Sequence, residues 1–192
     1  MGTLVSRVQG LCGRRHLTKA SILIIGPHGS GKTTILYRLK LNENVKPVPT
    51  LTYNVETLDM FEDLLLHVWD VSLGAKGLPL IRHFMEGHQG FFFVVDSKDT
   101  ETFIEAREDL RYHCTYSDTD DLPFIVLANK QDLDGACRPS ELLHHRRLDE
   151  IPGIPARRWD VCGCSGITGE GLHEALEKLC NMIKETEEMR RR

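Results

Sequence analysis

The segment at residues 26–33 has the residue types and spacing needed to hold phosphate. Its sequence, GPHGSGKT, matches the pattern G-x-x-x-x-G-K-[ST] and lies between an apolar run and a helical pattern. Glycines let backbone N–H groups curl around phosphate oxygens, and a helix N-terminus adds positive potential. Lys32 would then reach the β- and γ-phosphates of a nucleotide, and Thr33 would offer its hydroxyl to Mg²⁺. The predicted phosphate-binding residues are Gly26, His28, Gly29, Ser30, Gly31, Lys32, Thr33 and Thr34.

A second segment, NKQD at residues 129–132, has the polar groups needed to select a base. The Asp132 carboxylate can accept two hydrogen bonds, from the N1–H and 2-amino groups of guanine, whereas adenine presents no such pair of donors. Asn129 could tie this loop to the phosphate-binding loop, and the stem of Lys130 could cover the purine face. Together with the phosphate motif, this segment predicts a site for GTP or GDP.

The elements that would position these residues alternate between strand and helix patterns. Apolar runs predict strands over 20–25, 54–58, 64–69, 91–95, 124–128 and 159–164, with a hairpin turn at 60–63 between the second and the third. Helical spacing covers 33–41, 101–114, 140–148 and 172–183. This order predicts an α/β fold with a mostly parallel, doubly wound sheet and one antiparallel strand.

The candidate residues would share one edge of this sheet. The phosphate motif, Asp70, Asn129 and Ser165 each follow directly after a predicted strand. Ligands of open α/β sheets bind beyond the carboxyl ends of the strands. A polar loop after a strand is common, but these residue types at several strand ends together favour one shared binding site.

The composition limits the classes of protein to which the chain can belong. With 192 residues, 41% of them hydrophobic, the chain can bury one core, which predicts a domain over 20–183 between a leader at 1–19 and a charged tail at 184–192. The net charge of −4 argues against nucleic acid as a main partner. The six cysteines include no CxxC pair, which argues against a zinc site. No apolar run approaches the roughly 20 residues of a membrane span, and the N-terminus lacks a signal-peptide core.

Residues 20–183 resemble the Arf-like small GTPases, a branch of the Ras superfamily. The resemblance is carried by GPHGSGKTTILYRLK, VPTLTYNVETL, the WDV that begins at Trp69, FFFVVDS, LANKQDL and CSGITGEGL. It implies a P-loop NTPase fold of the small G-domain type. It also implies a monomer that binds GTP or GDP with Mg²⁺ and meets protein effectors and exchange factors.

The same resemblance implies roles for residues outside the two motifs. Thr50 would bind Mg²⁺ and the γ-phosphate when GTP is present, and Asp70 would hold Mg²⁺ through a water molecule. Ser165 and Gly166 would supply the loop near guanine O6, at a place where alanine is more usual than Gly166.

Three aromatic residues, Tyr53, Trp69 and Phe84, match positions with which relatives of this type contact effectors. The alternative is that these side chains take part in ordinary core packing, which is common for a tryptophan at the end of a strand.

The third nucleotide motif departs from the family pattern. Where relatives carry Trp-Asp-Val-Gly-Gly-Gln, this chain has WDVSLG at residues 69–74. Leu73 keeps a backbone N–H for the γ-phosphate, but its Cβ disfavours the left-handed conformations open to glycine. Gly74 replaces the Gln that would orient the attacking water, so no catalytic side chain is predicted. We therefore expect an altered switch and weak or absent GTP hydrolysis.

His28 could hydrogen-bond water near the phosphates, although a simply exposed loop histidine is the favoured interpretation.

The first six residues, MGTLVS, fit the N-myristoylation signature with Gly2 as the acceptor. A myristoyl chain alone binds membranes only marginally, so an amphipathic helix or an acylated Cys12 would be the second signal. These features predict peripheral contact with the cytoplasmic face of a membrane, and an unmodified, frayed terminus is the alternative. The apolar residues that share one helical face here are Leu4, Val5, Val8, Leu11 and Cys12.

These observations favour a GTP-binding regulatory protein that presents switch surfaces to effectors at cytoplasmic membranes and turns over GTP slowly or not at all. One alternative is a competent GTPase that recruits catalytic groups from a partner. Another is an interaction scaffold that kept the fold and works without nucleotide. A P-loop kinase fits less well, because it gives no reason for the NKQD segment.

Overall fold

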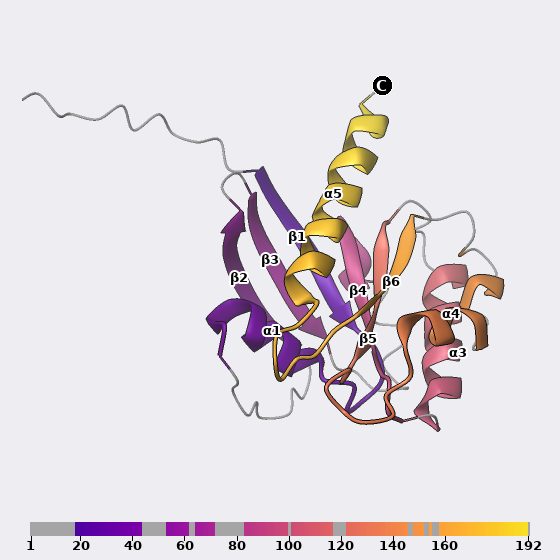
Figure 1. Cartoon of the computed structure of the whole chain (residues 1–192). Coiled ribbons are helices and arrows are strands. Elements are labelled where there is room, and N and C mark those ends of the chain that lie inside the picture. Colours follow the sequence, from indigo (N-terminus) through magenta and orange to yellow (C-terminus); the bar gives the residue numbers. More distant parts are fainter. Residues whose placement is uncertain are drawn as a thin grey trace, which may run out of the picture.

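The computed structural model describes residues 18–43, 53–61, 64–71, 83–99, 101–116, 122–145, 148–151, 154 and 158–191 (Figure 1). Its strands are β1 (Thr18–Ile25), β2 (Tyr53–Phe61), β3 (Leu64–Val71), β4 (Gly90–Asp96), β5 (Phe124–Asn129) and β6 (Trp159–Gly163). Its helices are α1 (Lys32–Leu41), α3 (Thr102–Tyr116), α4 (Pro139–His145) and α5 (Leu172–Arg190), with a 3₁₀ turn, η2 (Leu148–Glu150).

The described strands form one six-stranded sheet in the order β2-β3-β1-β4-β5-β6. β2 and β3 pair antiparallel, and the other neighbouring pairs are parallel. The predicted fold class, a mostly parallel α/β sheet with one antiparallel strand, is therefore confirmed.

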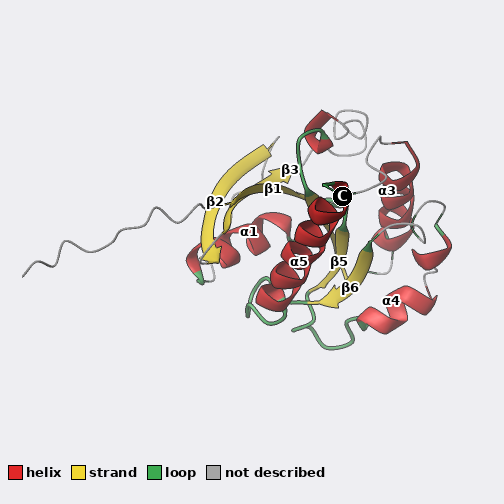
Figure 2. Ribbon diagram, turned by 90° about the horizontal axis from the view of Figure 1, so that it is seen from above, coloured by secondary structure: helices red, strands yellow, loops and turns green. Residues whose placement is uncertain are grey.

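The central strands are apolar throughout because helices cover both faces of the sheet. On β1, Ile22 and Ile24 join the core formed with α1 and α5, whereas Leu23 and Ile25 join the core formed with α3 and α4. Figure 2 shows α1 and α5 on one side of the sheet and α3 on the other. A strand buried on both faces appears in the sequence as an uninterrupted hydrophobic run, which is the signal that identified β1, β4 and β5.

Three predicted boundaries are wrong, two of them at the turn after β2 and at the end of α5. The turn expected at 60–63 begins too early, because β2 continues to Phe61 with a shift of register after Leu58. The final helix, expected to stop at Ile183, runs on to Arg190, so the predicted charged tail is mostly helical. Thr186 is buried, and the lysine, glutamate, methionine and arginine residues around it have high helix propensity.

The predicted helix at 140–148 is also shorter than expected. α4 ends at His145, and the separate η2 turn follows at Leu148. By contrast, the apolar face predicted for the final helix is confirmed, since its residues are all buried: Leu172, Ala175, Leu176, Leu179 and Ile183.

The first strand begins and the last helix ends at the same end of the sheet. β1 starts at Thr18 and α5 finishes at Arg190 at that end, and the carboxyl ends of the parallel strands lie at the other (Figure 1). The candidate residues follow those carboxyl ends. No helix in the described part of the chain combines the length and the apolar character that crossing a membrane requires.

Candidate nucleotide site

The loop at 26–31 joins β1 to α1 with a backbone that two of its glycines make possible. Gly26 has φ +138°, and a Cβ there would stand 2.2 Å from the carbonyl oxygen of Val94. Gly31 has φ +98°, and a Cβ there would stand 2.3 Å from Nδ2 of Asn129. Neither place has room for a side chain. The glycines of the motif therefore bring the loop close to β4 and β5, as a cradle for an ion requires.

The Lys32 side chain lies under this loop. Its Nζ donates to the carbonyl oxygens of Gly26 at 2.9 Å and Pro27 at 2.8 Å, and the side chain is buried. Burial lowers the pKa of Lys32, and the nearby charge of Asp70 opposes that shift. A phosphate oxygen would compete with these carbonyls for the same ammonium donors.

Thr33 and Asp70 place two oxygen atoms together at the start of α1. The Thr33 hydroxyl donates to Oδ2 of Asp70 over 2.5 Å, and Asp70 is fully buried near the end of β3. A hydroxyl and a carboxylate are the hard oxygen ligands that Mg²⁺ prefers, so this pair fits the predicted metal. Thr34, the next residue, lies beside Gly166, where an added Cβ would come within 3.3 Å of its methyl group.

Asn129 joins three loops, as predicted for its contact with the phosphate loop. Its Nδ2 donates to the carbonyl oxygen of Ser30 at 2.8 Å, and its Oδ1 accepts from the Gly166 N–H at 2.9 Å. Asn129 is buried at the end of β5. The side chain thus holds the phosphate loop against the loop that follows β6, residues 164–171, here named the base-side loop.

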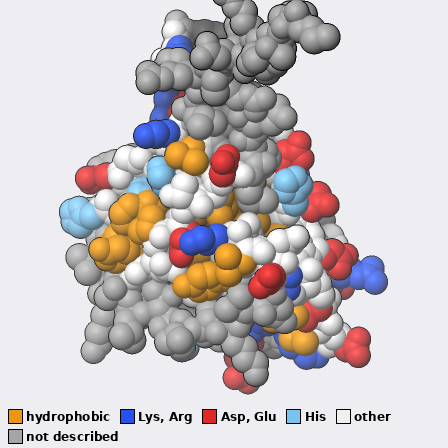
Figure 3. Space-filling view, turned by 90° about the vertical axis from the view of Figure 1, so that its left-hand side faces the viewer, with side chains coloured by type: hydrophobic (Ala, Val, Ile, Leu, Met, Phe, Trp, Pro, Cys, Tyr) orange, Lys and Arg blue, Asp and Glu red, His pale blue; other side chains and the backbone are white. Residues whose placement is uncertain are grey.

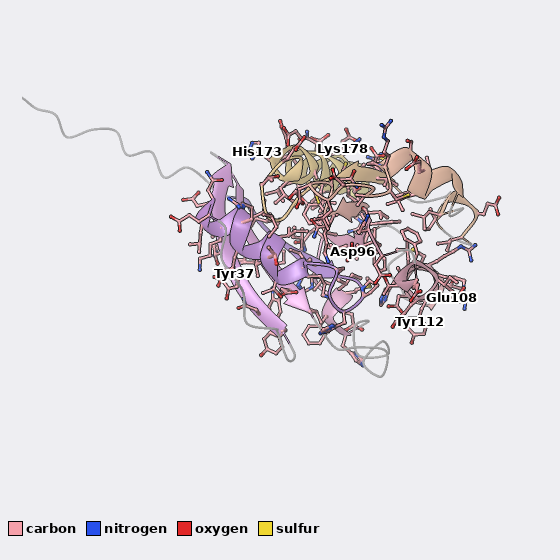
Figure 4. All side chains as sticks on the ribbon, turned by 60° about the horizontal axis from the view of Figure 1, so that its bottom comes forward. Tyr37, Asp96, Glu108, Tyr112, His173 and Lys178 are labelled. Carbon is pink, nitrogen blue, oxygen red and sulfur yellow. The ribbon has the colours of Figure 1, made fainter. Side chains whose placement is uncertain are left out.

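Lys130 has an ion-pair partner that the sequence argument missed. Its backbone is left-handed, with φ +67°, and its Nζ contacts Oδ2 of Asp96 at 2.5 Å. Asp96 lies near the centre of the molecule at the end of β4, where its Oδ1 also accepts from the Lys98 N–H (Figure 4). Asp96 could have been predicted from the sequence by the criterion used for Asp70 and Asn129, because it also lies at the end of a strand. Asp132 is exposed in the turn that follows.

The base-side loop is held by its own side chains. Ser165 is buried, and its hydroxyl oxygen accepts from the N–H groups of Ile167 at 3.2 Å and Thr168 at 3.0 Å. Gly166 is also buried, and its N–H is already engaged with Asn129. The structure therefore brings Ser165 and Gly166 next to Asn129, at the edge where the base is expected.

The three aromatic residues expected to contact effectors lie together. Tyr53 stacks on Trp69 with ring centroids 5.7 Å apart, and Phe84 lies 5.8 Å from Tyr53 and 6.3 Å from Trp69. Tyr53 is 52% exposed, while Trp69 and Phe84 also pack against the core, so surface and core roles coexist. His88, to which the sequence assigns no role or partner, meets Trp69 edge-on, and burial lowers its pKa. Figure 3 views the β2 side, where hydrophobic groups gather among charged side chains and histidines.

Several predicted residues lie outside the part of the chain that the structure describes. They are Thr50, Leu73, Gly74, Gly2 and Cys12, together with the rest of the predicted N-terminal apolar face. His28 is described and is exposed, as the simpler interpretation expected.

The parallel sheet, the glycine-bent loop ahead of α1 and the Thr33–Asp70 pair define a P-loop nucleotide-binding domain of the α/β class. The chain belongs to the ADP-ribosylation factor family, Arf, whose family model matches residues 6–183. Its fold is also similar to that of a solved small GTPase, Arl6 (BBS3) from Trypanosoma brucei with bound nucleotide analogue GppNp. The TM-score is 0.77 at 25% sequence identity, over 88% of this chain and 99% of that one.

Proposed function

We propose that this protein is a guanine-nucleotide-dependent regulatory switch, with GTP or GDP and Mg²⁺ bound at the edge formed by the phosphate loop, Asn129 and the base-side loop. The observation that carries the proposal is the Asn129 side chain, which joins the Ser30 carbonyl to the Gly166 N–H. This contact sets the base-reading segment beside the phosphate cradle, so one nucleotide would meet both. Thr33, Asp70 and Thr50 would hold Mg²⁺, which supplies charge neutralisation at the phosphates.

Base selection is the sharpest test of this function. The purified protein would be denatured, the released nucleotide identified by chromatography, and GDP and ADP titrated calorimetrically with Mg²⁺. Guanine nucleotide should be found and preferred. Asp132→Asn is the matched variant, because an amide can donate to the 2-keto group of xanthine, so GDP binding should fall and xanthosine diphosphate binding should rise. Equal heats for GDP and ADP would exclude the proposal.

Slow hydrolysis is a second part of the proposal, and it rests on the sequence at residues 73 and 74. Gly74 has no side chain to orient water, and Leu73 restricts the backbone beside it. Single-turnover decay of bound GTP should be slow in the native protein and faster in Leu73→Gly with Gly74→Gln. Decay accelerated by cell lysate would instead favour a GTPase that depends on a partner for catalysis.

The effector surface is assigned to Tyr53, Trp69 and Phe84 because the three rings form one partly exposed group. Partners captured from lysate should bind the GTP-analogue state better than the GDP state, and Tyr53→Ala should weaken that binding. Equal capture with GDP, with a GTP analogue and without nucleotide would favour a nucleotide-independent scaffold.

Membrane contact is proposed through Gly2 acylation and the N-terminal apolar residues. Mass spectrometry of protein isolated from eukaryotic cells should show a myristoyl group, and Gly2→Ala should abolish flotation with anionic vesicles. If the native protein carries no acyl group and still floats with the vesicles, another segment makes the membrane contact.

A further inference from the structure

Arg38 on α1 reaches the base-side loop with its guanidinium group. Its Nε donates to the carbonyl oxygen of Gly166 at 3.3 Å, and its Nη2 donates to the carbonyl oxygen of Ile167. Its Nη1 donates to the carbonyl oxygen of Asn42, the C-cap residue that follows α1, at 3.2 Å. One planar group thus holds consecutive carbonyls of the base-side loop against the end of a helix.

The loop also packs on the stem of Arg38. Gly169 has φ +89°, and a Cβ there would stand 3.3 Å from Cδ of Arg38. Its neighbour Tyr37, labelled in Figure 4, has a different role, since its hydroxyl accepts from Asn54 on β2. Arg38 therefore belongs to the side of α1 that meets the base-side loop.

Gly166 is held from both sides. Asn129 accepts from its N–H at 2.9 Å, and Arg38 donates to its carbonyl at 3.3 Å. The two bonds engage the two peptide planes that meet at the Cα of Gly166, because its N–H belongs to the Ser165–Gly166 peptide and its carbonyl to the Gly166–Ile167 peptide. Holding both planes restricts rotation about the Cα between them. An Asn129 contact alone would leave the carbonyl side of the loop free to turn.

We propose that Arg38 is a positioning residue for recognition of guanine O6, acting through the base-side loop. This rests on the proposed function, in which the Gly166 N–H shares its proton between Asn129 and O6. Arg38 restricts the direction of that N–H from the next peptide group along the chain, because it holds the carbonyls of Gly166 and Ile167. Asp132 reads the opposite side of the base and is independent of Arg38.

The test compares release of three diphosphates, GDP, 6-thio-GDP and IDP, from the Mg²⁺-loaded full-length protein. 6-Thio-GDP keeps the N1–H and 2-amino groups and replaces only O6 by sulfur, a weaker acceptor, while IDP lacks only the 2-amino group that faces Asp132. Arg38→Ala should release GDP about tenfold faster than the native protein. The native protein should release 6-thio-GDP faster than GDP, and this ratio should approach one in Arg38→Ala. The ratio for IDP over GDP should stay unchanged.

The variants separate positioning from general support of the fold. Arg38→Lys keeps the charge but lacks the planar fork, so its ratio of 6-thio-GDP release to GDP release should fall between those of the native protein and Arg38→Ala. This variant carries the test if Arg38→Ala does not fold. Lys40→Ala is the matched control, because Lys40 lies on the same helix and pairs with Glu56 on β2. It should release all three nucleotides as the native protein does.

A 6-thio-GDP ratio that is the same in Arg38→Ala and the native protein, or a ratio of one in the native protein itself, would overturn the inference while leaving guanine binding intact. A native protein that retains no guanine nucleotide would overturn the proposed function and this inference with it.

Discussion

The two halves of the candidate site differ in what their polar groups contact. On the base side, Asn129 bonds to Ser30 and Gly166, and Lys130 pairs with Asp96. These contacts can persist when a base arrives, because they lie between loops and guanine O6 would share the Gly166 N–H with Asn129 without displacing it. On the phosphate side, Lys32 bonds to the carbonyls of its own loop, bonds that a phosphate would replace.

One half of the site therefore stabilises the fold, and the other half serves mainly to bind the ligand. The base side joins loops far apart in sequence, so its contacts stabilise the fold whether or not nucleotide is present. On the phosphate side, the bonds of Lys32 to loop carbonyls are ones that a phosphate would replace. Burial disfavours the charged form of Lys32 until a phosphate is present. Substitutions in the two halves should therefore separate stability from affinity.

Lys32→Ala should have the largest effect and should break the phosphate side alone. Affinity for GDP should fall about 100- to 1000-fold, because charge-assisted bonds to phosphate are lost. The free energy of unfolding without nucleotide should change by less than about 1 kcal/mol, since relief from burying the ammonium charge offsets the loss of its hydrogen bonds to two carbonyls. Calorimetric titration and denaturant unfolding measure the two quantities. A loss of stability as large as the loss of binding energy would contradict the division between the halves.

Asn129→Ala should have the second largest effect and should appear in stability even without nucleotide. The Ser30 carbonyl and the Gly166 N–H would each lose a partner in a buried place, at a cost of about 2–3 kcal/mol in the free energy of unfolding. Denaturant unfolding of the nucleotide-free protein provides the measurement. Asn181→Ala, at an exposed position on α5, is the control and should leave stability within about 0.5 kcal/mol. An unchanged midpoint for Asn129→Ala would show that the base side is not assembled before the ligand.

The smallest expected effect is a pH dependence that reports the charge of Lys32. Burial, with the nearby charge of Glu105, raises the pKa of Asp109 to about 6, and the charge of Lys32 opposes that rise. The native state therefore binds this proton more tightly than the unfolded chain, so stability should fall as pH rises from about 4 to about 6. Because Asp109 is only partly buried, we expect about 1 kcal/mol over that window.

Asp109→Asn isolates this contribution, measured as the difference between two unfolding curves over pH. Burial lowers the pKa of His113 to about 4, which gives a slope of opposite sign in nearly the same window, but both proteins share it. With Lys32→Ala as the background, the Asp109 window should extend above pH 6. If the pH window of Asp109 is the same with and without Lys32, then Lys32 is uncharged in the nucleotide-free protein.

The fold could be predicted largely because its strands are buried on both faces. Continuous apolar runs marked β1, β4 and β5, and they placed the phosphate motif and Asn129 at the same edge. The bond from Asn129 to Ser30 followed from that placement, although 99 residues separate them. Strand ends are a strong constraint because all the parallel strands present theirs at one side of the sheet.

Contacts between loops and helix surfaces could not be predicted in this way. The bond from Arg38 to Gly166 spans 128 residues, and no local pattern distinguishes Arg38 from a solvated arginine on a helix. The end of α5 is hidden for a related reason, because the charge density at 184–192 is typical of a solvated tail although these residues also have high helix propensity. The loop that a polar side chain on a helix surface reaches, and the conformation of that loop, depend on packing that periodicity does not encode.

The shared position of the start of β1 and the end of α5 has a practical consequence for studying this protein. An immobilising tag or a dye joined after Arg190 would sit on the side of the domain remote from the phosphate loop. Surface-based binding sensors and single-molecule fluorescence could therefore present the nucleotide edge to solution in one orientation, without the probe obstructing exchange.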